Sequence, residues 1–173
     1  MWFTGLSAAG KTTVANIVEA ELEQRGLLVE HLDGDIVRTH LSKGLGFTKE
    51  DRDANIARIG WVASRIARAG AAVVVSAISP YEDARRHARS LVESHAPFIE
   101  VYVATPLEEC ARRDPKGLYA AAFAGKIGDF TGVSAPYETP SNPEITLDTT
   151  GVSPTESAAM VIERLAALNV VAA

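Results

Sequence analysis

The chain has 173 residues, with 17 Lys and Arg against 22 Asp and Glu, and a formal net charge of −5 at pH 7. Hydrophobic residues make up 47% and charged residues 23%, a balance typical of a globular domain with its own core. The acidic balance argues against a nucleic-acid coat or a basic membrane patch, although a local positive pocket stays open. The longest apolar stretch, around residues 70–78, is too short to span a membrane.

Neither a signal peptide nor a disulfide framework is indicated. No basic segment precedes an apolar core at the start of the chain. The single cysteine, Cys110, excludes an internal disulfide and a multi-cysteine zinc site, and we expect it to be a small buried filler. A reducing, cytoplasmic setting is the simplest interpretation. Repeats and long linkers are lacking, so we predict one domain over residues 1–173.

Apolar runs alternate with helical patterns along the chain. The predicted strands are Met1–Thr4, Leu27–Leu32, Ala71–Ser76, Phe98–Val103 and Ile145–Leu147. The predicted helices are Lys11–Gln24, Asp35–Leu41, Lys49–Ala69, Pro80–Ser94, Pro106–Arg112, Leu118–Ala124 and Pro154–Ala167. Near-continuous apolar strands are typical of a sheet covered on both faces. The pattern therefore predicts an α/β fold of three layers around a mainly parallel five-stranded sheet.

A phosphate-binding motif follows the first predicted strand. Residues 5–12, GLSAAGKT, fit the pattern G-x-x-x-x-G-K-[ST] between a strand and a helix. Gly5 and Gly10 let the backbone bend so that successive N–H groups converge on an anion, next to the positive end of the helix. We expect Lys11 to reach the β- and γ-phosphates and Thr12 to offer its hydroxyl to Mg²⁺. The motif predicts binding of a nucleoside triphosphate with Mg²⁺.

The rest of the chain favours a small-molecule kinase among P-loop proteins. The guanine-reading pattern N-K-x-D is absent from the sequence, which argues against a small GTPase. The third predicted strand ends at Ser76, where motor ATPases usually place a metal-holding aspartate. Residues 125–142 are rich in Gly, Pro and small polar residues, and we interpret them as a mobile lid or loop.

Charged residues that suit an acceptor follow the second predicted strand. Asp33, Asp35 and Arg38 leave the strand end at the edge of a parallel sheet where ligands bind. Asp35 could orient or deprotonate an attacking hydroxyl, and Arg38 could hold an anion. Asp33 can equally be a helix cap, Asp35 part of a turn, and Arg38 a surface charge.

A second group of binding candidates surrounds the start of the long third helix. Thr48 can cap this helix, and Arg52 and Asn55 are three residues apart, so they share a face. Phe47 could stack on a base. Taken alone, Phe47 in the core and Arg52 as a solvated charge are the simpler interpretations.

Three helix starts carry the same signature. Ser79, Thr105 and Ser153 each precede a proline and stand three residues before a glutamate. The pattern predicts a capping box at each helix, with the hydroxyl at the N-cap and proline at the first helical position.

In combination, these motifs resemble the adenylylsulfate kinase family, the adenosine 5′-phosphosulfate (APS) kinases of sulfate assimilation. The segments that carry the resemblance, in chain order, are the P-loop, Leu32-Asp33-Gly34-Asp35, Leu45-Gly46-Phe47, Arg52 with Asn55, Ser76-Ala77-Ile78-Ser79-Pro80, Arg113-Asp114-Pro115-Lys116-Gly117-Leu118-Tyr119 and Phe130-Thr131-Gly132. The resemblance runs from about Met1 to the last helix. It implies a P-loop NTPase fold with a lid at about residues 114–137.

The resemblance implies that ATP and Mg²⁺ are used to phosphorylate the 3′-hydroxyl of APS, giving 3′-phosphoadenosine 5′-phosphosulfate (PAPS) and ADP. The implied catalytic residues are Lys11, Asp35 and Lys116. The implied ATP-binding residues are Gly5, Leu6, Ser7, Ala8, Ala9, Gly10, Lys11, Thr12, Thr13 and Arg113, of which Thr12 binds Mg²⁺ and Arg113 lies near the adenine. The implied APS-binding residues are Asp35, Arg38, Phe47, Arg52, Asn55, Ile78, Ser79, Lys116, Gly117, Leu118 and Phe130.

Within the APS set, the resemblance assigns particular tasks. Phe47 and Phe130 would sandwich the APS adenine with Ile78 at its edge. Arg38, Arg52 and Asn55 would hold the phosphosulfate and ribose. Lys116 would help the phosphates and close with the lid. A serine matching Ser79 has been discussed in the family as a phosphate acceptor, but we favour the helix cap because the capping pattern explains a serine.

Departures from the family concern Ala9, Phe123 and the start of the chain. Ala9 stands where a hydroxyl or glycine is common, and a backbone cradle tolerates it. Phe123 stands where a basic residue is frequent, which is expected to loosen a lid contact. The first strand begins at Met1 without the N-terminal arm of many relatives, which suggests a minimal form or a domain cut from a bifunctional protein.

The resemblance also implies a homodimer and a possible fused or partner ATP sulfurylase. Two other functions stay open. One is phosphoryl transfer to another small hydroxyl acceptor, such as a sugar or an antibiotic, and the other is a non-catalytic nucleotide-binding regulatory module. The paired phenylalanines favour a nucleotide base over a sugar, and the intact set of charged residues argues against a degenerate module.

Overall fold

The computed structural model describes residues 1–171. Across these residues five parallel strands form one sheet in the order β2-β3-β1-β4-β5. The strands are β1 (Trp2–Thr4), β2 (Val29–Asp33), β3 (Ala72–Ser76), β4 (Glu100–Val103) and β5 (Ile145–Leu147). The helices are α1 (Lys11–Gln24), α2 (Gly34–His40), α3 (Lys49–Arg68), α4 (Glu82–Glu93), α5 (Leu107–Arg113), α6 (Leu118–Phe123) and α7 (Pro154–Ala167).

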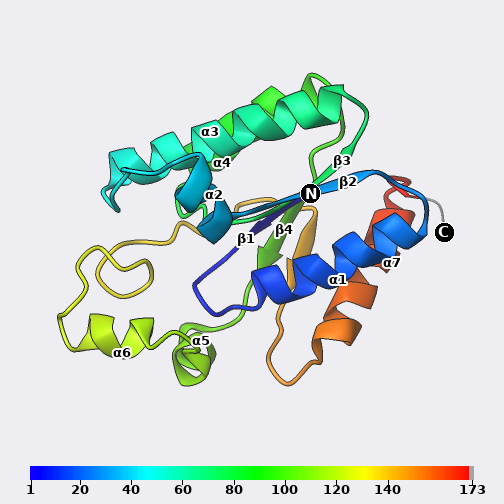
Figure 1. Ribbon diagram of the computed structural model, residues 1–173. Coiled ribbons are helices and arrows are strands. Elements are labelled where there is room, and N and C mark those ends of the chain that lie inside the picture. The colour runs from blue at the N-terminus through cyan, green and yellow to red at the C-terminus, as the bar shows by residue number, and fades with distance from the viewer. Residues whose placement is uncertain (172–173) are drawn as a thin grey trace.

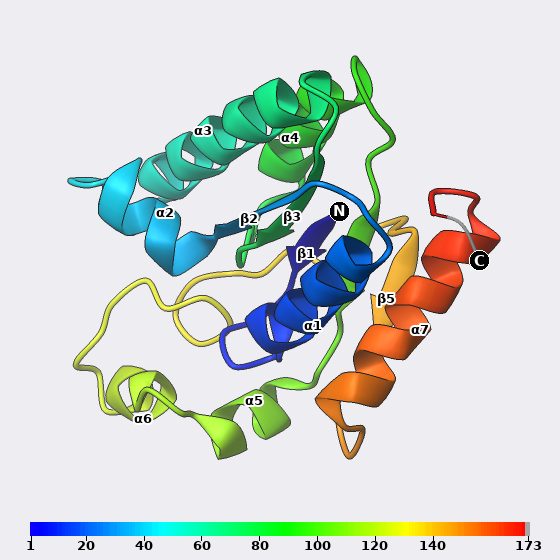
Figure 2. The ribbon, with the colours of Figure 1, turned by 45° about the vertical axis from the view of Figure 1, so that its right-hand side comes forward.

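The sheet lies between two layers of helices (Figures 1 and 2). Helices α3 and α4 cover one face, and α1 and α7 cover the other, while α5, α6 and the long loop after them extend from the carboxyl edge of the sheet. No helix among the residues that the structure describes is long and apolar enough to cross a bilayer. The predicted α/β fold with a mainly parallel five-stranded sheet is confirmed.

Alternating side chains of the central strands fill both layers. In β1, Phe3 belongs to the core cluster of α1 and α7, and Trp2 belongs to the cluster of α3 and α4. In β3, Val74 and Val75 divide in the same way. Because each strand is buried on both faces, its residues read as an apolar run and not as an alternation. This explains why the apolar runs predicted the strands well.

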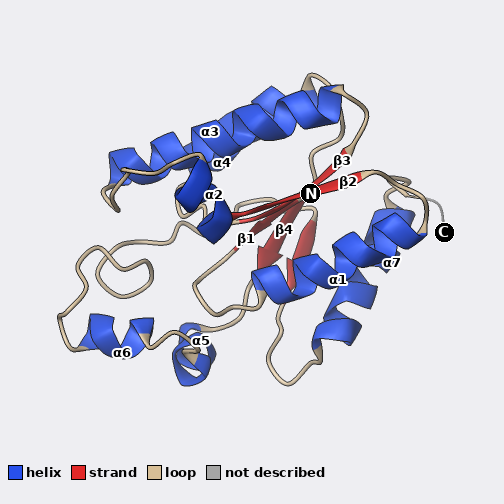
Figure 3. Ribbon diagram, viewed as in Figure 1, coloured by secondary structure: helices blue, strands red, loops and turns tan. Residues whose placement is uncertain are grey.

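The predicted elements all occur, with boundaries that differ by two residues at most (Figure 3). The bounds of α1, α7 and β5 are as predicted, and α4 begins at Glu82 instead of Pro80. Between residues 125 and 142 the structure has neither helix nor strand, in keeping with the predicted loop. Thr48 caps α3 as expected, with its hydroxyl accepting a hydrogen bond from the N–H of Asp51 at 3.2 Å.

Of the three predicted capping boxes, only the one at Ser153 forms. The Ser153 hydroxyl accepts from the N–H of Glu156, and the Glu156 carboxylate accepts from the N–H of Ser153. The prediction for Thr105 is wrong because α5 has Pro106 at its N-cap. Thr105 instead donates its hydroxyl to the carbonyl of Ala9 in the P-loop, at 3.0 Å.

The predicted cap at Ser79 is also wrong. The N-cap of α4 is Tyr81, which makes no side-chain capping bond, and the N–H of Glu82 is bound by the Glu138 carboxylate at 2.7 Å. Ser79 is buried with a φ of 48°, and its hydroxyl accepts the indole N–H of Trp2 at 3.0 Å. A buried indole N–H needs a partner, so tertiary packing takes the hydroxyl that the local pattern assigned to the helix.

Candidate active site

A cleft of about 770 Å³ opens at the carboxyl edge of the sheet. In Figure 1, α2 and α3 lie on one side of this edge, and α5 and α6 lie on the other. The walls of the cleft come from the P-loop, the ends of β2 and β3, the start of α3 and the loop around residues 113–131. The lining residues are Ser7, Ala8, Gly10, Lys11, Thr12, Thr13, Asp33, Gly34, Asp35, Ile36, Arg38, Phe47, Arg52, Asn55, Ile56, Ser76, Ala77, Ile78, Ser79, Pro80, Arg113, Pro115, Lys116, Leu118, Phe130 and Thr131.

The P-loop has the backbone that an anion cradle requires. Gly5 and Gly10 adopt φ values of 143° and 103°, and Ala8 lies at 57°, so the chain turns back on itself before α1. A Cβ at Gly5 would lie 2.5 Å from the carbonyl oxygen of Val103, which leaves room only for glycine. The turn directs the amino end of α1 toward the cleft, where its unpaired N–H groups and dipole favour negative charge.

The P-loop lysine is held inside the cradle. The ammonium group of Lys11 donates to the carbonyl oxygens of Gly5 at 3.0 Å and Leu6 at 2.6 Å. Lys11 is 8% exposed, and this burial lowers its pKa to about 8. A desolvated cation next to converging N–H groups interacts strongly with an incoming phosphate.

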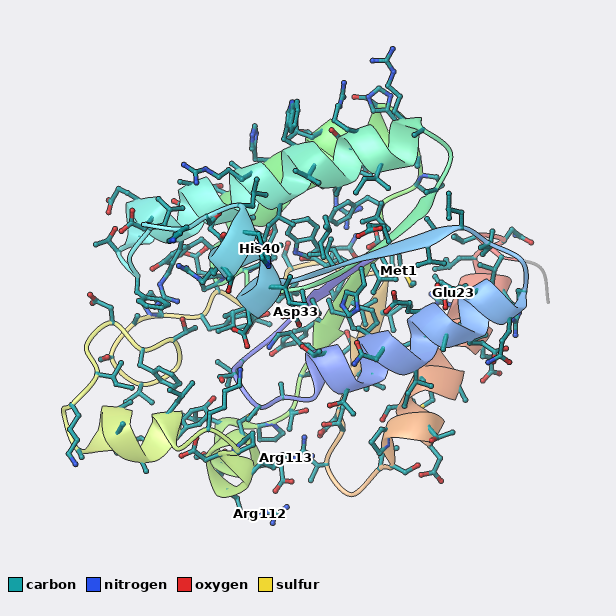
Figure 4. All side chains as sticks on the ribbon, in the orientation of Figure 1. Met1, Glu23, Asp33, His40, Arg112 and Arg113 are labelled. Atoms are coloured by element: carbon teal, nitrogen blue, oxygen red, sulfur yellow. The ribbon has the colours of Figure 1, made fainter. Side chains whose placement is uncertain are left out.

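A hydroxyl–carboxylate group lies beside the lysine. The Thr12 hydroxyl donates to Oδ2 of Asp33 at 2.8 Å, and the Ser76 hydroxyl donates to the same oxygen at 3.0 Å. Burial favours the neutral form of Asp33, but hydrogen bonds from Thr12, Ser76 and backbone N–H groups outweigh it and lower the pKa. Oδ1 of Asp33 accepts from the N–H of Asp35 and caps α2, so the alternative of a helix cap is confirmed. Figure 4 shows Asp33 where β2 meets α2.

The second carboxylate of this strand end forms an ion pair across the cleft. Asp35 contacts the ammonium group of Lys116, and both side chains are largely exposed. The hydrogen bond from Lys116 to Asp35 raises the pKa of Lys116. Two residues predicted to be catalytic are therefore in direct contact, although they are 81 positions apart in the chain.

Two arginines gather around one aromatic ring on the far side of the cleft. The guanidinium carbon of Arg38 lies 4.5 Å from the ring centroid of Phe47, and that of Arg52 lies 5.6 Å from it. Burial lowers the pKa of Arg38, and the nearby charge of Arg52 lowers it further. Phe47 is 58% exposed and does not enter the core, so that alternative is wrong. Two cations this close favour an anionic ligand between them.

Arg52 and Asn55 are buried, which excludes the alternative of a solvated Arg52. Arg52 donates to the carbonyl of Phe47 at 2.7 Å, to the hydroxyl of Thr131 at 2.7 Å and to the carbonyl of Asp129. Asn55 is 5% exposed, and within residues 1–171 its Oδ1 has no hydrogen-bond partner. An unpaired buried amide oxygen on the wall of a cleft is a natural contact for a ligand donor.

The predicted lid segment is attached to the rest of the domain at several points. The Tyr119 hydroxyl donates to the carbonyl of Ser7 in the P-loop at 3.0 Å, and the ring of Phe130 packs edge-on against Tyr119. Further along, the Tyr137 hydroxyl lies 2.9 Å from that of Thr4. Phe123 is 61% exposed. The segment therefore covers one side of the cleft and ends in an anchor at the sheet.

Arg113 stands beside the P-loop at the end of α5 (Figure 4). Its guanidinium donates to the hydroxyl of Thr149 at 2.8 Å, to the Thr149 carbonyl at 2.9 Å and to Glu109 at 2.8 Å. The same Thr149 hydroxyl donates to the carbonyl of Ala9 at 2.9 Å. Arg113 is thus fixed next to the loop that follows β5.

Most of the residues predicted from the sequence line this cleft. The exceptions are Gly5, Leu6, Ala9 and Gly117. The prediction missed Ser76 and Thr131 and left Asp33 as one of two alternatives. Ser76 stood at a strand end that the sequence had marked, but its partner Asp33 belongs to another strand, and the sequence does not tell which strands are neighbours. Nothing in the sequence indicated that Thr131 receives a hydrogen bond from Arg52.

A P-loop and a carboxylate facing a group of cations across one cleft define a P-loop kinase of a small acceptor. The family model described as Adenylylsulphate kinase matches residues 1–148. The chain belongs to the adenylylsulphate kinase family, and the resemblance stated from the motifs is confirmed. The adenylyl-sulfate kinase of Halothermothrix orenii is 54% identical over 165 residues, which cover 95% of this chain and 88% of the relative.

Two further similar proteins bear on ligands and domain organisation. The structure of the Mycobacterium tuberculosis APS kinase CysC in complex with AMPPNP and APS has a TM-score of 0.91 and 45% identity, over 95% of each chain. A probable bifunctional SAT/APS kinase 2 of Sorangium cellulosum is 50% identical over 171 residues. That match covers 99% of this chain but 29% of the relative.

Proposed function

We propose that this chain transfers the γ-phosphoryl group of ATP to the 3′-hydroxyl of APS, giving PAPS and ADP in sulfate activation. The observation that carries the proposal is the cleft itself, with an anion cradle at one end and two clustered arginines around Phe47 at the other. Family membership and a similar structure that binds AMPPNP and APS support both ligands. A nucleotide donor and an anionic nucleotide acceptor fit these two ends.

On the donor side, the P-loop backbone and Lys11 bind the ATP phosphates. Lys11 supplies a desolvated positive charge, which is most useful as negative charge spreads over the transferred group. Arg113 belongs to the ATP side because Thr149 and Glu109 fix it next to the P-loop. The other P-loop residues of the predicted ATP set act through backbone N–H groups.

The donor set beside the P-loop fits Mg²⁺. The Thr12 hydroxyl and the Asp33 carboxylate, already hydrogen-bonded to each other, are the hard oxygen ligands that Mg²⁺ takes alongside phosphate oxygens and water. Thr12 and Asp33 would hold the ion directly or through water, with Ser76 bonded to the carboxylate. The bound ion would neutralise charge on the phosphates.

On the acceptor side, Asp35 orients or deprotonates the 3′-hydroxyl of APS. Arg38 and Arg52 bind the phosphosulfate, and the unpaired Oδ1 of Asn55 accepts a hydrogen bond from the acceptor. Phe47 binds the adenine together with Phe130, Ile78 and the surrounding residues of the predicted APS set. Ser79 lines the wall of the cleft. We do not assign it the role of a phosphate acceptor, because its hydroxyl is hydrogen-bonded to the indole N–H of Trp2.

Lys116 acts as a shared residue between the two sides. Its ion pair with Asp35 places the ammonium group next to the carboxylate, while both side chains stay largely exposed. When the acceptor hydroxyl reaches Asp35, the ammonium group turns to the phosphates, and the lid at residues 114–137 closes over both substrates. The single domain, the homodimer, the ATP sulfurylase partner and the cytoplasmic setting stay predictions, and the bifunctional relative supports such a fusion partner.

The test is the initial rate of ADP release from ATP and Mg²⁺, with and without micromolar APS, together with a measurement of PAPS. We expect APS-dependent ADP release with matching PAPS. Lys11→Ala should lower kcat by about 10²–10³-fold because it removes charge stabilisation in the transition state. Lys43→Ala, outside the cleft, serves as the matched control. ATP binding without any APS dependence would point instead to another hydroxyl acceptor or to a regulatory module.

A further inference from the structure

A line of hydrogen bonds runs from α1 to the P-loop hydroxyl through the ends of β2 and β3. Oε2 of Glu19 lies 2.9 Å from Nδ1 of His31, and Nε2 of His31 lies 2.9 Å from the hydroxyl oxygen of Ser76. Ser76 donates to Oδ2 of Asp33 at 3.0 Å, and Thr12 donates to the same oxygen at 2.8 Å. Five side chains from three elements, α1, β2 and β3, form this line, which ends on the hydroxyl–carboxylate pair described above.

The donors in this line can be assigned from the acceptors at its two ends. The carboxylates of Glu19 and Asp33 only accept, and Ser76 carries a single proton, which goes to Asp33. Nε2 of His31 therefore donates to the oxygen of Ser76, and Nδ1 lies within hydrogen-bond distance of Glu19, to which it donates when the ring is the imidazolium. Glu19 fixes the direction of the ring, and the ring fixes the direction of the serine hydroxyl.

The surroundings make this line a rigid one. The side chain of His31 is 11% exposed and Ser76 is 3% exposed, so water competes little for their hydrogen bonds. The carboxylate of Asp33 is held on both sides, because Oδ1 accepts from the backbone of α2 while Oδ2 accepts from the two hydroxyls. Without the Ser76 bond, Thr12 alone would orient Oδ2.

We propose that His31, oriented by Glu19, is a positioning residue that directs the Ser76 hydroxyl onto Asp33 and thereby sets Asp33 and Thr12 for magnesium–nucleotide binding. The inference rests on the proposed function, since it takes Thr12 and Asp33 as the magnesium side of the ATP site. Residues that orient metal ligands typically contribute 10–100-fold to metal affinity. We expect an effect of about tenfold, at the lower end of that range, because His31 acts through Ser76.

The test compares His31→Asn with His31→Gln by calorimetric titration of ADP, in MgCl₂ and in EDTA. The amide nitrogen of glutamine reaches the place of Nε2 and can still donate to Ser76, whereas that of asparagine reaches only the place of Nδ1. The Mg²⁺-dependent gain in ADP affinity should fall about tenfold in His31→Asn and about twofold at most in His31→Gln. ADP affinity in EDTA should stay unchanged in both.

Two more comparisons separate positioning from a loss of structure. Glu19→Ala should reduce the same gain, and Glu23→Ala, near the carboxyl end of the same helix (Figure 4), should not. In a Ser76→Ala background, His31→Asn should add no further loss, because the line is already broken at the serine. In steady-state assays, the KM for Mg-ATP should rise while the KM for APS stays constant. If His31→Asn does not fold, Glu19→Ala and Ser76→Ala carry the same prediction.

If His31→Asn and His31→Gln reduce the Mg²⁺-dependent gain equally, or if ADP affinity in EDTA falls in parallel, the positioning role of His31 is refuted while the magnesium site is not. A wild-type protein whose ADP affinity does not respond to Mg²⁺ would overturn it together with the magnesium site. Because ADP titration needs no APS, either result is distinct from a failure of APS phosphorylation.

Discussion

Removal of one buried arginine should destabilise the whole domain. Arg85 of α4 is 2% exposed. Its Nη1 donates to the carbonyl of Ser79 at 2.8 Å, and its Nη2 donates to Glu82 at 2.5 Å and to the carbonyl of Glu138 at 2.8 Å. Nε lies 2.9 Å from Oε1 of Glu100, an ion pair whose geometry is too poor for a hydrogen bond. Arg85 thus joins the wall of the acceptor pocket to the anchor of the lid.

The size of the effect follows from the carboxylate that Arg85→Met would leave behind. Glu100 is 8% exposed, and burial raises its pKa even though Arg85 and Arg89 both act against the rise. Breaking a buried pair by removing one partner typically costs 3–5 kcal/mol, so we expect a loss of about 4 kcal/mol in the free energy of unfolding. That is a large share of the roughly 5–15 kcal/mol that stabilises a domain.

The assay is urea unfolding followed by tryptophan fluorescence. The matched control is Arg86→Met, one residue further along α4, whose ion pair with Asp83 has side chains 68% and 82% exposed. It should leave the midpoint unchanged. The double variant Arg85→Met, Glu100→Gln should recover part of the loss, because the second change removes the unpaired charge.

The pH dependence gives an independent check. In Arg85→Met the pKa of Glu100 rises further in the folded state, so the folded protein binds more protons than the unfolded chain above the ordinary value of 4.5. The free energy of unfolding of the variant then falls as pH rises above 4.5. The stability that Arg85→Met loses relative to the wild type is therefore smaller at pH 5 than at pH 7. Equal losses for Arg85→Met and Arg86→Met, or no recovery in the double variant, would refute the reasoning.

Two other substitutions and one exchange measurement test the site. Arg52→Ala should raise the KM for APS at least about tenfold and that for ATP far less, since a charge-assisted contact is lost; equal rises would contradict its place on the acceptor side. Ser79→Ala should retain most of the turnover but lose about 1–3 kcal/mol of stability, because the Trp2 indole stays buried without a partner; a kinetic loss like that of Lys11→Ala would argue for a phosphoenzyme. Hydrogen exchange over residues 114–137 should slow with ADP and APS, and unchanged exchange would remove the lid.

The sequence predicted the elements of this fold because their signals are local. The apolar run that contains Val74 and Val75 needs no knowledge of its neighbours to indicate a buried strand. The errors arose where a polar side chain had both a local and a distant partner available. Ser79 and Thr105 fit a capping box, yet Ser79 bonds to Trp2 and Thr105 to the P-loop.

The site was predicted in outline for a different reason. Its motifs follow predicted strands, and the carboxyl ends of parallel strands meet at one edge of the sheet. The order β2-β3-β1-β4-β5 has no signature in the sequence. Without the strand order, nothing indicated that Ser76 donates to Asp33 or that His31 contacts Ser76. Arg85 looked like any charge on an amphipathic helix, because its partner Glu100 lies on a strand that follows later in the chain.

The sheet order also explains how the second half of the chain shapes a site whose charged groups come mainly from the first. Asp33 and Ser76 are the last residues of β2 and β3, on one side of the P-loop strand. Thr105 and Thr149 follow β4 and β5 on the other side, and both donate to the carbonyl of Ala9, at 3.0 Å and 2.9 Å. These two hydrogen bonds fix the backbone of the P-loop at Ala9. The cradle therefore depends on the backbone at this position, and an alanine in place of a hydroxyl or glycine residue leaves it intact.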